Sequence, residues 1–167
     1  MSSAWVGIDP GARGALAVVD SDGAWSAIDM PLQGAEGALE VSGMLAALRR
    51  RMDTVVVCVE HQRAYGGQGV VSSCALGQSY GWIRGVVDAW LGHARSAAHL
   101  VAPHEWQPAI LGRRVKGGPT AKDRALVVAA EAAPSIALRT PRGRVLDGRA
   151  DAICIALFAR QKWSTPW

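Results

Sequence analysis

The sequence predicts an α/β protein in which a mixed β-sheet carries helices on both faces. Three observations predict this class. The chain opens with three short apolar strands joined by tight turns. Two further strands alternate with segments of helical periodicity, and three more helical segments complete the chain. The resulting order, βββ-α-β-α-β-α-α-α, implies a mixed sheet between two helical layers.

The length and composition fit one globular domain over residues 1–167. Half of the residues are hydrophobic, which is enough to build a core. The three cysteines are odd in number and include no Cys-x-x-Cys pair, which argues against a zinc ribbon or a disulfide framework. No apolar run reaches the roughly 18 residues of a membrane span, and no secretory signal is visible. We therefore expect a cytoplasmic protein that makes no contact with a membrane.

The strands are predicted from apolar runs that end at turns. Asp20-Ser21-Asp22-Gly23 is typical of a hairpin turn between the second and third strands. The run from Thr54 to Val59 is apolar on both faces, which favours a central strand. The five strands are predicted at residues 4–9, 15–19, 24–29, 54–59 and 99–102.

The helices are predicted from apolar periodicity and from residues that suit helix ends. Arg49, Arg50 and Arg51 stand in the last turn of the first helix, where basic side chains complement the helix dipole. The five helices are predicted at residues 36–51, 70–94, 104–111, 120–133 and 148–162.

A stripe of glycines marks the second predicted helix. Gly77, Gly81 and Gly85 recur on one face, although each glycine costs up to ~1 kcal/mol in a helix interior. The stripe indicates close approach of another backbone, which is either the sheet or a partner chain.

Two acidic residues stand at the ends of apolar strands. Asp9 ends the first strand and Glu60 ends the most apolar one. A carboxylate beside a core needs a partner or a cation, because its charge is costly to bury. Each has a simpler alternative: Asp9 before Pro-Gly is also typical of a turn, and Arg63 is a potential salt-bridge partner of Glu60.

A second acidic pair opens the last predicted helix. Asp147 and Asp151 are four residues apart and therefore share one helical face, where like charges repel by a few tenths of a kcal/mol. An N-cap is the simpler alternative for Asp147. Asp151 has apolar neighbours on both sides, so we expect it to face the body of the protein.

Together, the four carboxylates Asp9, Glu60, Asp147 and Asp151 predict a metal site. In a mixed sheet, two strand ends and a helix start can converge on one point. Ligation by oxygen alone suits Mg²⁺ or Mn²⁺ rather than zinc, and four negative charges balance two divalent ions. Two such ions ~4 Å apart are the arrangement needed for phosphodiester hydrolysis.

The basic residues suit a polyanionic substrate. The net charge is +4, and without the four carboxylates 10 acidic residues face 18 basic ones, so the remainder carries about +8. Two loops concentrate this charge: Arg113, Arg114 and Lys116 in one, and Arg139, Arg142 and Arg144 in the other. Both are consistent with plain solvated loops, but beside a carboxylate site we favour contact with phosphates.

Three motifs, in order, resemble the RuvC-type Holliday junction resolvases. They are Gly7-Ile8-Asp9-Pro10-Gly11; Glu60 with Gln62 and then Leu76-Gly77-Gln78-Ser79-Tyr80-Gly81; and Asp147-Gly-Arg-Ala-Asp151-Ala. The last is most similar to the bacteriophage-encoded branch. The first motif alone is weak, because sugar kinases and actin-like folds begin similarly. The three in order span nearly the whole chain and are specific.

The resemblance implies an RNase H-like fold with a five-stranded mixed sheet whose second strand is antiparallel. It also implies a homodimer in a bacterial or phage-infected cell that nicks two strands of a four-way DNA junction symmetrically. Each active site would use two Mg²⁺ ions, with Mn²⁺ as a substitute and no nucleotide cofactor. Carried over by position, Asp9 bridges the metals, Glu60 holds one and orients water, and Asp147 and Asp151 complete the site.

The resemblance extends to DNA contacts, with departures. Lys122 stands where the family has a basic residue near the scissile phosphate, although a solvent-facing helix position is also consistent. Gln107 stands where bacterial members carry a Lys, so the positive charge at that point is either missing or supplied by Arg113 or Lys116. Tyr65 either stacks on an unpaired base or caps the core. The expected DNA-contacting residues are Arg63, Tyr65, Arg113, Arg114, Lys116, Lys122, Arg142 and Arg144.

Two other classes of function stay open. A branched-DNA-binding module without catalysis would use the dimer and the basic loops but would not need the carboxylates. A phosphotransferase of the actin and sugar-kinase type normally needs two such domains, for which 167 residues are too few. We favour a metal-dependent, structure-selective endonuclease.

Overall fold

Five strands form one mixed sheet in a computed structural model that describes residues 2–11, 13–30, 35–62, 67, 69–91 and 96–164. The strands are β1 (Ser3–Asp9), β2 (Ala15–Asp20), β3 (Trp25–Asp29), β4 (Thr54–Glu60) and β5 (Ser96–Val101). Their order in the sheet is β3-β2-β1-β4-β5. β2 is antiparallel to β1 and β3, whereas β4 is parallel to β1 and β5. The predicted mixed sheet with an antiparallel second strand is confirmed.

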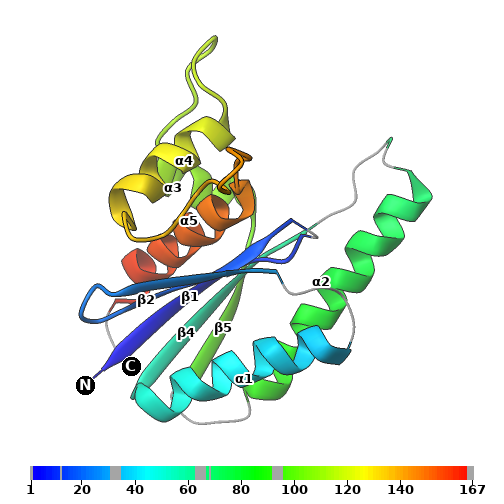
Figure 1. Ribbon diagram of the computed structural model, residues 1–167, viewed down its shortest axis with the longest axis vertical. Coiled ribbons are helices and arrows are strands. Elements are labelled where there is room, and N and C mark those ends of the chain that lie inside the picture. The colour runs from blue at the N-terminus through cyan, green and yellow to red at the C-terminus, as the bar shows by residue number, and fades with distance from the viewer. Residues whose placement is uncertain are drawn as a thin grey trace.

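Helices cover both faces of this sheet, as predicted. They are α1 (Ala35–Arg51), α2 (Val70–Trp90), α3 (Pro103–Leu111), α4 (Ala121–Ala132) and α5 (Asp147–Lys162). α3, α4 and α5 lie on one side of the sheet, and α1 and α2 lie on the other (Figure 1). None of the described helices is both long and apolar enough to cross a membrane.

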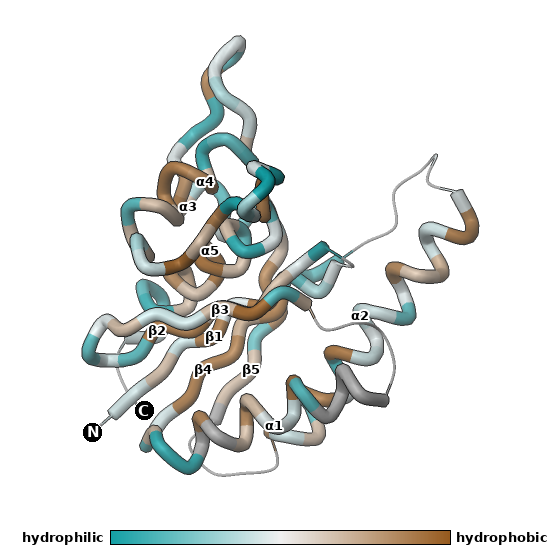
Figure 2. Tube along the Cα trace, viewed as in Figure 1, coloured by the Kyte–Doolittle hydropathy of each residue, from teal (hydrophilic) through white to brown (hydrophobic). Residues whose placement is uncertain are grey.

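Each helical layer encloses its own core, and alternation along the strands decides which residue faces which layer. In β4, Val56 and Cys58 pack towards α5, whereas Val55, Val57 and Val59 belong to the core under α1 and α2. Figure 2 shows the apolar residues following the strands between the two layers. β4 is buried on both faces because it lies inside the sheet, as its apolar run predicts.

The fifth strand begins earlier than its sequence indicates. β5 starts at Ser96 rather than residue 99, and Ala97 and Ala98 pair with Val56 and Val57 of β4. Small residues carry little intrinsic strand preference, so the pairing with β4 decides this boundary. The second helix ends earlier than predicted, at Trp90 with Leu91 as its C-cap, and residues 92–94 lie outside the described part of the chain.

The glycine stripe of α2 does not pack on the sheet, and that prediction was wrong. A Cβ atom built on Gly77, Gly81 or Gly85 would have no described atom within 4 Å. α2 instead buries the opposite face, with Ser79, Ile83, Val87 and Trp90. Helical periodicity shows that the three glycines share one face of α2. The burial of larger side chains decides which face of the helix packs against the sheet. Packing of the stripe on a partner chain stays a prediction.

Candidate active site

The sheet and α5 bring the four predicted carboxylates to one end of the molecule. Asp9 and Glu60 end β1 and β4, which are parallel neighbours, so both lie at the same edge. α5 begins at Asp147 and crosses β1 at very short range, because a Cβ on Gly7 would overlap the carbonyl oxygen of Ala152.

A second glycine sets the start of α5 against the turn after β1. A Cβ on Gly148 would overlap the carbonyl oxygen of Arg13, so the helix begins directly on the β1–β2 turn. This close approach carries Asp147 and Asp151 towards Asp9. Both glycines therefore serve the geometry of the site by allowing backbone to meet backbone.

The pKa values show that these carboxylates share one electrostatic environment. Burial raises the pKa of Asp151 to about 7, and the charges of Asp9, Glu60 and Asp147 add to this shift. Burial, with the charge of Asp9, also raises the pKa of Glu60 to about 7. Burial chiefly raises the pKa of Asp9 as well, with a contribution from Asp147. Like charges held together in this way need an external cation to be stable when ionised.

Neutral donors hold Glu60 and Asp9. Trp106 Nε1 donates to Glu60 Oε1 at 3.0 Å, and Gln62 Nε2 donates to Glu60 Oε2 at 3.0 Å. Gln62 Nε2 also reaches Asp9 Oδ1 at 3.4 Å, and the backbone N–H of Gly11 donates to the same oxygen at 3.1 Å. The alternative salt bridge of Glu60 with Arg63 falls on a residue outside the described ranges.

A lysine neutralises the fourth carboxylate. Lys122 Nζ lies 2.5 Å from Asp147 Oδ2, which lowers the pKa of Asp147 and raises that of Lys122. Asp147 is the first residue of α5 and the N-cap is Leu146, so the N-cap interpretation of Asp147 was wrong. Lys122 itself stands in the first turn of α4, which Thr120 caps through a hydrogen bond with the backbone N–H of Asp123 at 3.2 Å.

The carboxylate oxygens are suitable ligands for a hard divalent cation. Their present positions, however, do not form a coordination site. Within the described residues, no group of three or more His, Cys, Asp or Glu side chains has the geometry of a metal site. Lys122 holds Asp147, and the amide of Gln62 lies between Asp9 and Glu60. The available donors are carboxylate oxygens with an excess of negative charge, which Mg²⁺ and Mn²⁺ prefer.

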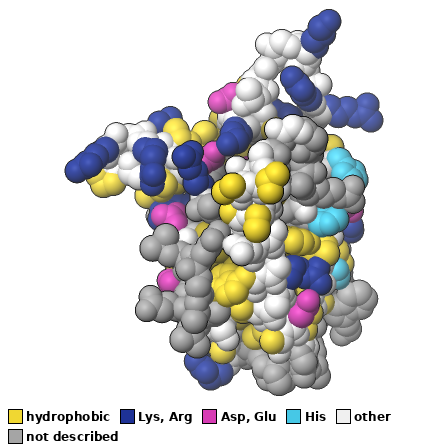
Figure 3. All heavy atoms as spheres, turned by 90° about the vertical axis from the view of Figure 1, so that its right-hand side faces the viewer, with side chains coloured by type: hydrophobic (Ala, Val, Ile, Leu, Met, Phe, Trp, Pro, Cys, Tyr) yellow, Lys and Arg dark blue, Asp and Glu magenta, His cyan; other side chains and the backbone are white. Residues whose placement is uncertain are grey.

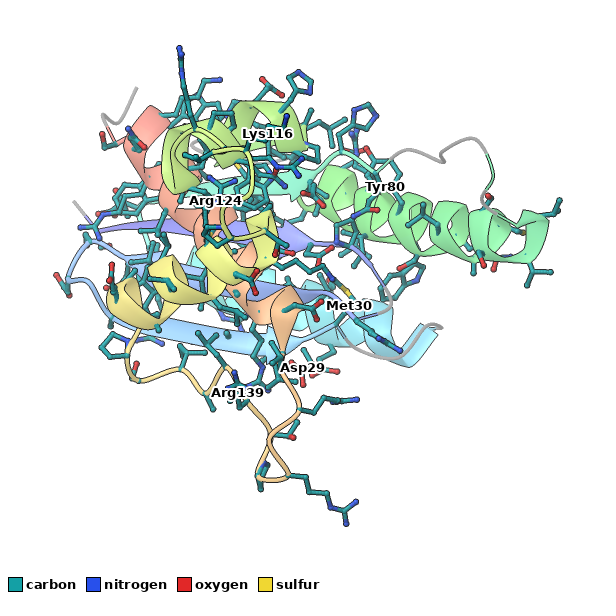
Figure 4. The ribbon with its side chains drawn as sticks, turned by 90° about the horizontal axis from the view of Figure 1, so that it is seen from above. Asp29, Met30, Tyr80, Lys116, Arg124 and Arg139 are labelled. Carbon is teal, nitrogen blue, oxygen red and sulfur yellow. The ribbon has the colours of Figure 1, made fainter. Side chains whose placement is uncertain are left out.

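Two basic projections stand beside this end of the sheet. The basic loop (residues 112–118) joins α3 to α4 and exposes Arg113, Arg114 and Lys116. The basic hairpin (residues 139–145) closes through a bridge between Arg139 and Val145 and exposes Arg142 and Arg144. Figure 3 shows most Lys and Arg side chains of that face at the upper end of the molecule, and Figure 4 shows Lys116 and Arg139 on separate loops. Arg63 and Tyr65 lie outside the described residues.

Solved structures share this architecture. Thermus thermophilus RuvC aligns with a TM-score of 0.57 and 23% identity over 99% of this chain and 98% of that chain. T. thermophilus RuvC in complex with a Holliday junction substrate aligns with a TM-score of 0.57 and 20% identity, over 100% of this chain and 99% of that chain. The chain has the RuvC fold. No protein-family model matches the sequence, and no curated protein does. At these identities the likeness shows the fold, while activity depends on the site residues.

Within the RuvC fold, sequence reasoning missed three residues that shape the site. Trp106 was predicted only as part of a short helix, and Gln62 only as part of a motif, yet both hold Glu60. Arg13 was unassigned, although it lies in the turn that follows the first motif and supports α5. Gln62 and Arg13 could have been found from their proximity in sequence to Glu60 and Asp9. Trp106 gave no such local signal, because its contact with Glu60 spans 46 residues.

Proposed function

We propose that this chain is a metal-dependent endonuclease that resolves four-way DNA junctions and related branched DNA. The observation that carries the proposal is the set of half-buried carboxylates, Asp9, Glu60 and Asp151, which come from three elements and whose pKa values are all raised, chiefly by burial and further by the charge of a neighbouring carboxylate. Such repulsion opposes folding, so its presence favours a role in binding cations. The fold supports the substrate class, since T. thermophilus RuvC was solved with a Holliday junction substrate.

Asp9, Glu60, Asp147 and Asp151 would together hold two Mg²⁺ ions, for which Mn²⁺ would substitute. Bound ions of this kind activate water and stabilise the leaving oxygen in phosphodiester hydrolysis. Trp106 and Gln62 orient the two oxygens of Glu60, and Gln62 also restrains Asp9. Lys122 is paired with Asp147 and would place its positive charge close to the scissile phosphate. The proposed catalytic residues are therefore the four carboxylates and Lys122.

The basic loop and the basic hairpin would bind the DNA backbone on either side of the reaction centre. The proposed contacts are Arg113, Arg114, Lys116, Arg142 and Arg144, all of which are exposed. Arginine suits this task because its planar guanidinium can donate two hydrogen bonds to one phosphate. Arg63 and Tyr65, which follow Glu60 in the sequence and lie outside the described residues, complete the proposed set.

We propose that the active form is a homodimer of single-domain chains. Symmetric nicking of two strands requires two sites, and the start of α2 offers an apolar surface. Val70 and Val71 are 85% and 83% exposed, and the glycine face of the same helix is open. Sedimentation of the purified chain, compared with that of Val71→Asp, tests this assembly.

The decisive experiment combines three labelled DNAs with matched carboxylate variants. A synthetic four-way junction, a Y-fork and a linear duplex are incubated with Mg²⁺, Mn²⁺ or EDTA. Asp9→Asn and Asp147→Asn are compared with Asp22→Asn, which changes an exposed aspartate in the β2–β3 turn. We expect paired nicks in opposing junction strands, lost in the first two variants and in EDTA, and retained in the third.

The other outcomes change the conclusion in defined ways. Equal cutting of the fork would widen the activity to a branch nuclease. Cleavage that survives in Asp147→Asn would refute its assignment as a ligand. Tight junction binding without cleavage in any divalent metal would identify a non-catalytic binding module instead.

A further inference from the structure

A cavity of about 350 Å³ lies beside the carboxylates, between the β1–β2 turn, the end of β3 and the segment that leads into α5. Its charged lining consists of Arg13, Asp29, Arg144, Asp147 and Arg149. Figure 4 shows Asp29 at the end of β3, near the base of the hairpin at Arg139. Because Asp147 belongs both to this wall and to the proposed active site, a group bound here would lie next to the reaction centre.

The two acidic groups of the cavity are already neutralised. Arg149 Nε and Nη2 contact the carboxylate of Asp29 at 2.6 and 3.1 Å, and Arg149 Nη1 donates to the carbonyl oxygen of Ala137 at 3.0 Å. Asp147 is paired with Lys122. Neither acidic group is therefore free to repel an anion.

Two guanidinium groups remain for a ligand. Arg13 and Arg144 are exposed, and neither takes part in the salt bridges formed among the described residues. Lys122 balances the charge of Asp147, and Arg149 balances that of Asp29. Arg13 and Arg144 are the remaining charged residues of the lining, so the cavity carries a charge of about +2. Arginines that have no acidic partner among the described residues, and that lie beside the proposed phosphodiester-cleaving site, suit a second phosphate.

The backbone at both positions is held in place. In the turn of Arg13, the N–H of Gly14 donates to Gly11 O at 2.7 Å, and Gly14 O accepts from the N–H of Met30 at 2.9 Å. Arg144 exchanges two hydrogen bonds with Thr140, through its own N–H to Oγ1 at 3.1 Å and from the N–H of Thr140 to its carbonyl at 2.9 Å. Both arginines therefore line the same cavity from backbone segments that hydrogen bonds hold in place, which reduces the entropy lost when they bind an anion.

We infer that Arg13 and Arg144 form a subsite for one DNA backbone phosphate adjacent to the phosphate that is cut. The inference rests on the proposed function. It adds Arg13 to the proposed DNA-contacting residues, and it assigns one phosphate to two arginines that are far apart in the sequence. The ligand is an internal phosphodiester of the bound strand. Its role is to set the register of the strand, because backbone contacts position DNA without reading its sequence.

The test measures binding of a synthetic four-way junction in EDTA at salt concentrations from about 50 to about 200 mM. The variants are Arg13→Ala, Arg144→Ala and the double variant, with Arg50→Ala as the control. Arg50 is also exposed, and it lies in the last turn of α1, on the opposite face of the sheet. We expect each single variant to bind about ten-fold more weakly and to reduce the slope of log K against log salt by about 1, while the control matches wild type.

The double variant and a chemically modified junction test whether Arg13 and Arg144 bind the same phosphate. If both arginines bind one group, the double variant loses less affinity than the product of the two single losses. A junction with a single neutral methylphosphonate next to the mapped cut site should weaken wild-type binding as Arg13→Ala does. The same junction should not weaken Arg13→Ala further.

The outcomes separate this inference from the proposed function. If wild type and Arg50→Ala bind the junction and Arg13→Ala binds it with the same affinity and salt slope, the subsite is refuted and the proposed function is untouched. If losses in the double variant multiply, the two arginines bind different phosphates, which also refutes the subsite. If wild type does not bind junctions at all, both the proposed function and the subsite fail.

Discussion

Trp106 Nε1 lies 3.0 Å from Glu60 Oε1, so an indole on α3 holds a carboxylate at the end of β4. The indole is only 1% exposed, and its N–H can donate but not accept. With Gln62 on the other oxygen, each oxygen of Glu60 accepts a hydrogen bond from a neutral side chain. Partners of this kind fix the direction of a metal ligand and are costly to remove.

We expect Trp106→Phe to weaken metal binding while preserving the fold. The substitution keeps an aromatic ring in the core and removes one donor, and loss of such a partner typically costs about 10- to 100-fold in metal affinity or activity. The measurements are the Mg²⁺ concentration for half-maximal cleavage and the heat of Mn²⁺ binding by calorimetry. Trp90→Phe is the matched control, since the buried Nε1 of Trp90 has no hydrogen-bond partner among the described residues. Equal metal affinity in the two variants would contradict the role of Trp106.

In EDTA, we expect the free energy of unfolding to fall as the pH rises from about 4 to about 7. The folded-state pKa values of Glu60 and Asp151 are raised to about 7, and that of Asp9 is also raised. The native state therefore holds more protons than the unfolded state in this window, and stability decreases with pH. We expect a loss of about 2 kcal/mol, or about 4–8 °C in Tm, between pH 5 and pH 8. Thermal unfolding of wild type and Asp151→Asn checks this, because the variant should show a flatter profile. A wild-type Tm that rises with pH over this range would count against the cluster.

Mg²⁺ should reverse that loss at pH 8. Ligands that bind only the native state stabilise it, by about 2.7 kcal/mol at 100 times Kd. We expect the Tm of wild type and of Asp22→Asn to rise on adding Mg²⁺, and the Tm of Asp9→Asn to change little. Thermal scans with and without the metal make the comparison without any DNA. A shift of equal size in Asp9→Asn would place the bound ion elsewhere.

Lys122→Met should impair cleavage with little effect on stability. The side chain of Lys122 is 68% exposed, and exposed ion pairs contribute only about 0–1 kcal/mol. Loss of a cation near the scissile phosphate should instead reduce the single-turnover rate by about 10²-fold. Lys122→Arg keeps the charge and should retain part of the activity. If Lys122→Met cleaves at the wild-type rate, Lys122 has no role in catalysis and only pairs with Asp147.

Two glycine substitutions should act in opposite directions. Gly148→Ala forces a Cβ against the backbone at Arg13, so we expect the free energy of unfolding to fall by about 1–3 kcal/mol. Gly77→Ala meets open space on α2 and should raise it by up to about 1 kcal/mol in the monomer. Urea unfolding gives both values. Sedimentation of Gly77→Ala adds a test of the dimer, because a methyl group on a buried glycine face would weaken association.

The sequence by itself determined the order and type of the elements and the identity of the acidic residues. Apolar runs, turn residues and helical periodicity are local properties, so they predict β1 through β4 and the five helices without knowledge of packing. Asp9 and Glu60 can be identified from the sequence because each is a charged residue directly after an apolar run, and a charge beside a core is costly to bury. The start of β5 escaped prediction, since Ser96, Ala97 and Ala98 become a strand only by pairing with β4.

The tertiary structure alone decided which groups surround each carboxylate and which face of α2 turns inward. Trp106 meets Glu60 across 46 residues, and Lys122 meets Asp147 across 25. The cavity of Arg13 and Arg144 likewise joins a turn near the start of the chain to a hairpin near its end. Such contacts depend on how elements pack in three dimensions. Periodicity along the chain records only which residues share a face, and carries no information about what that face will meet.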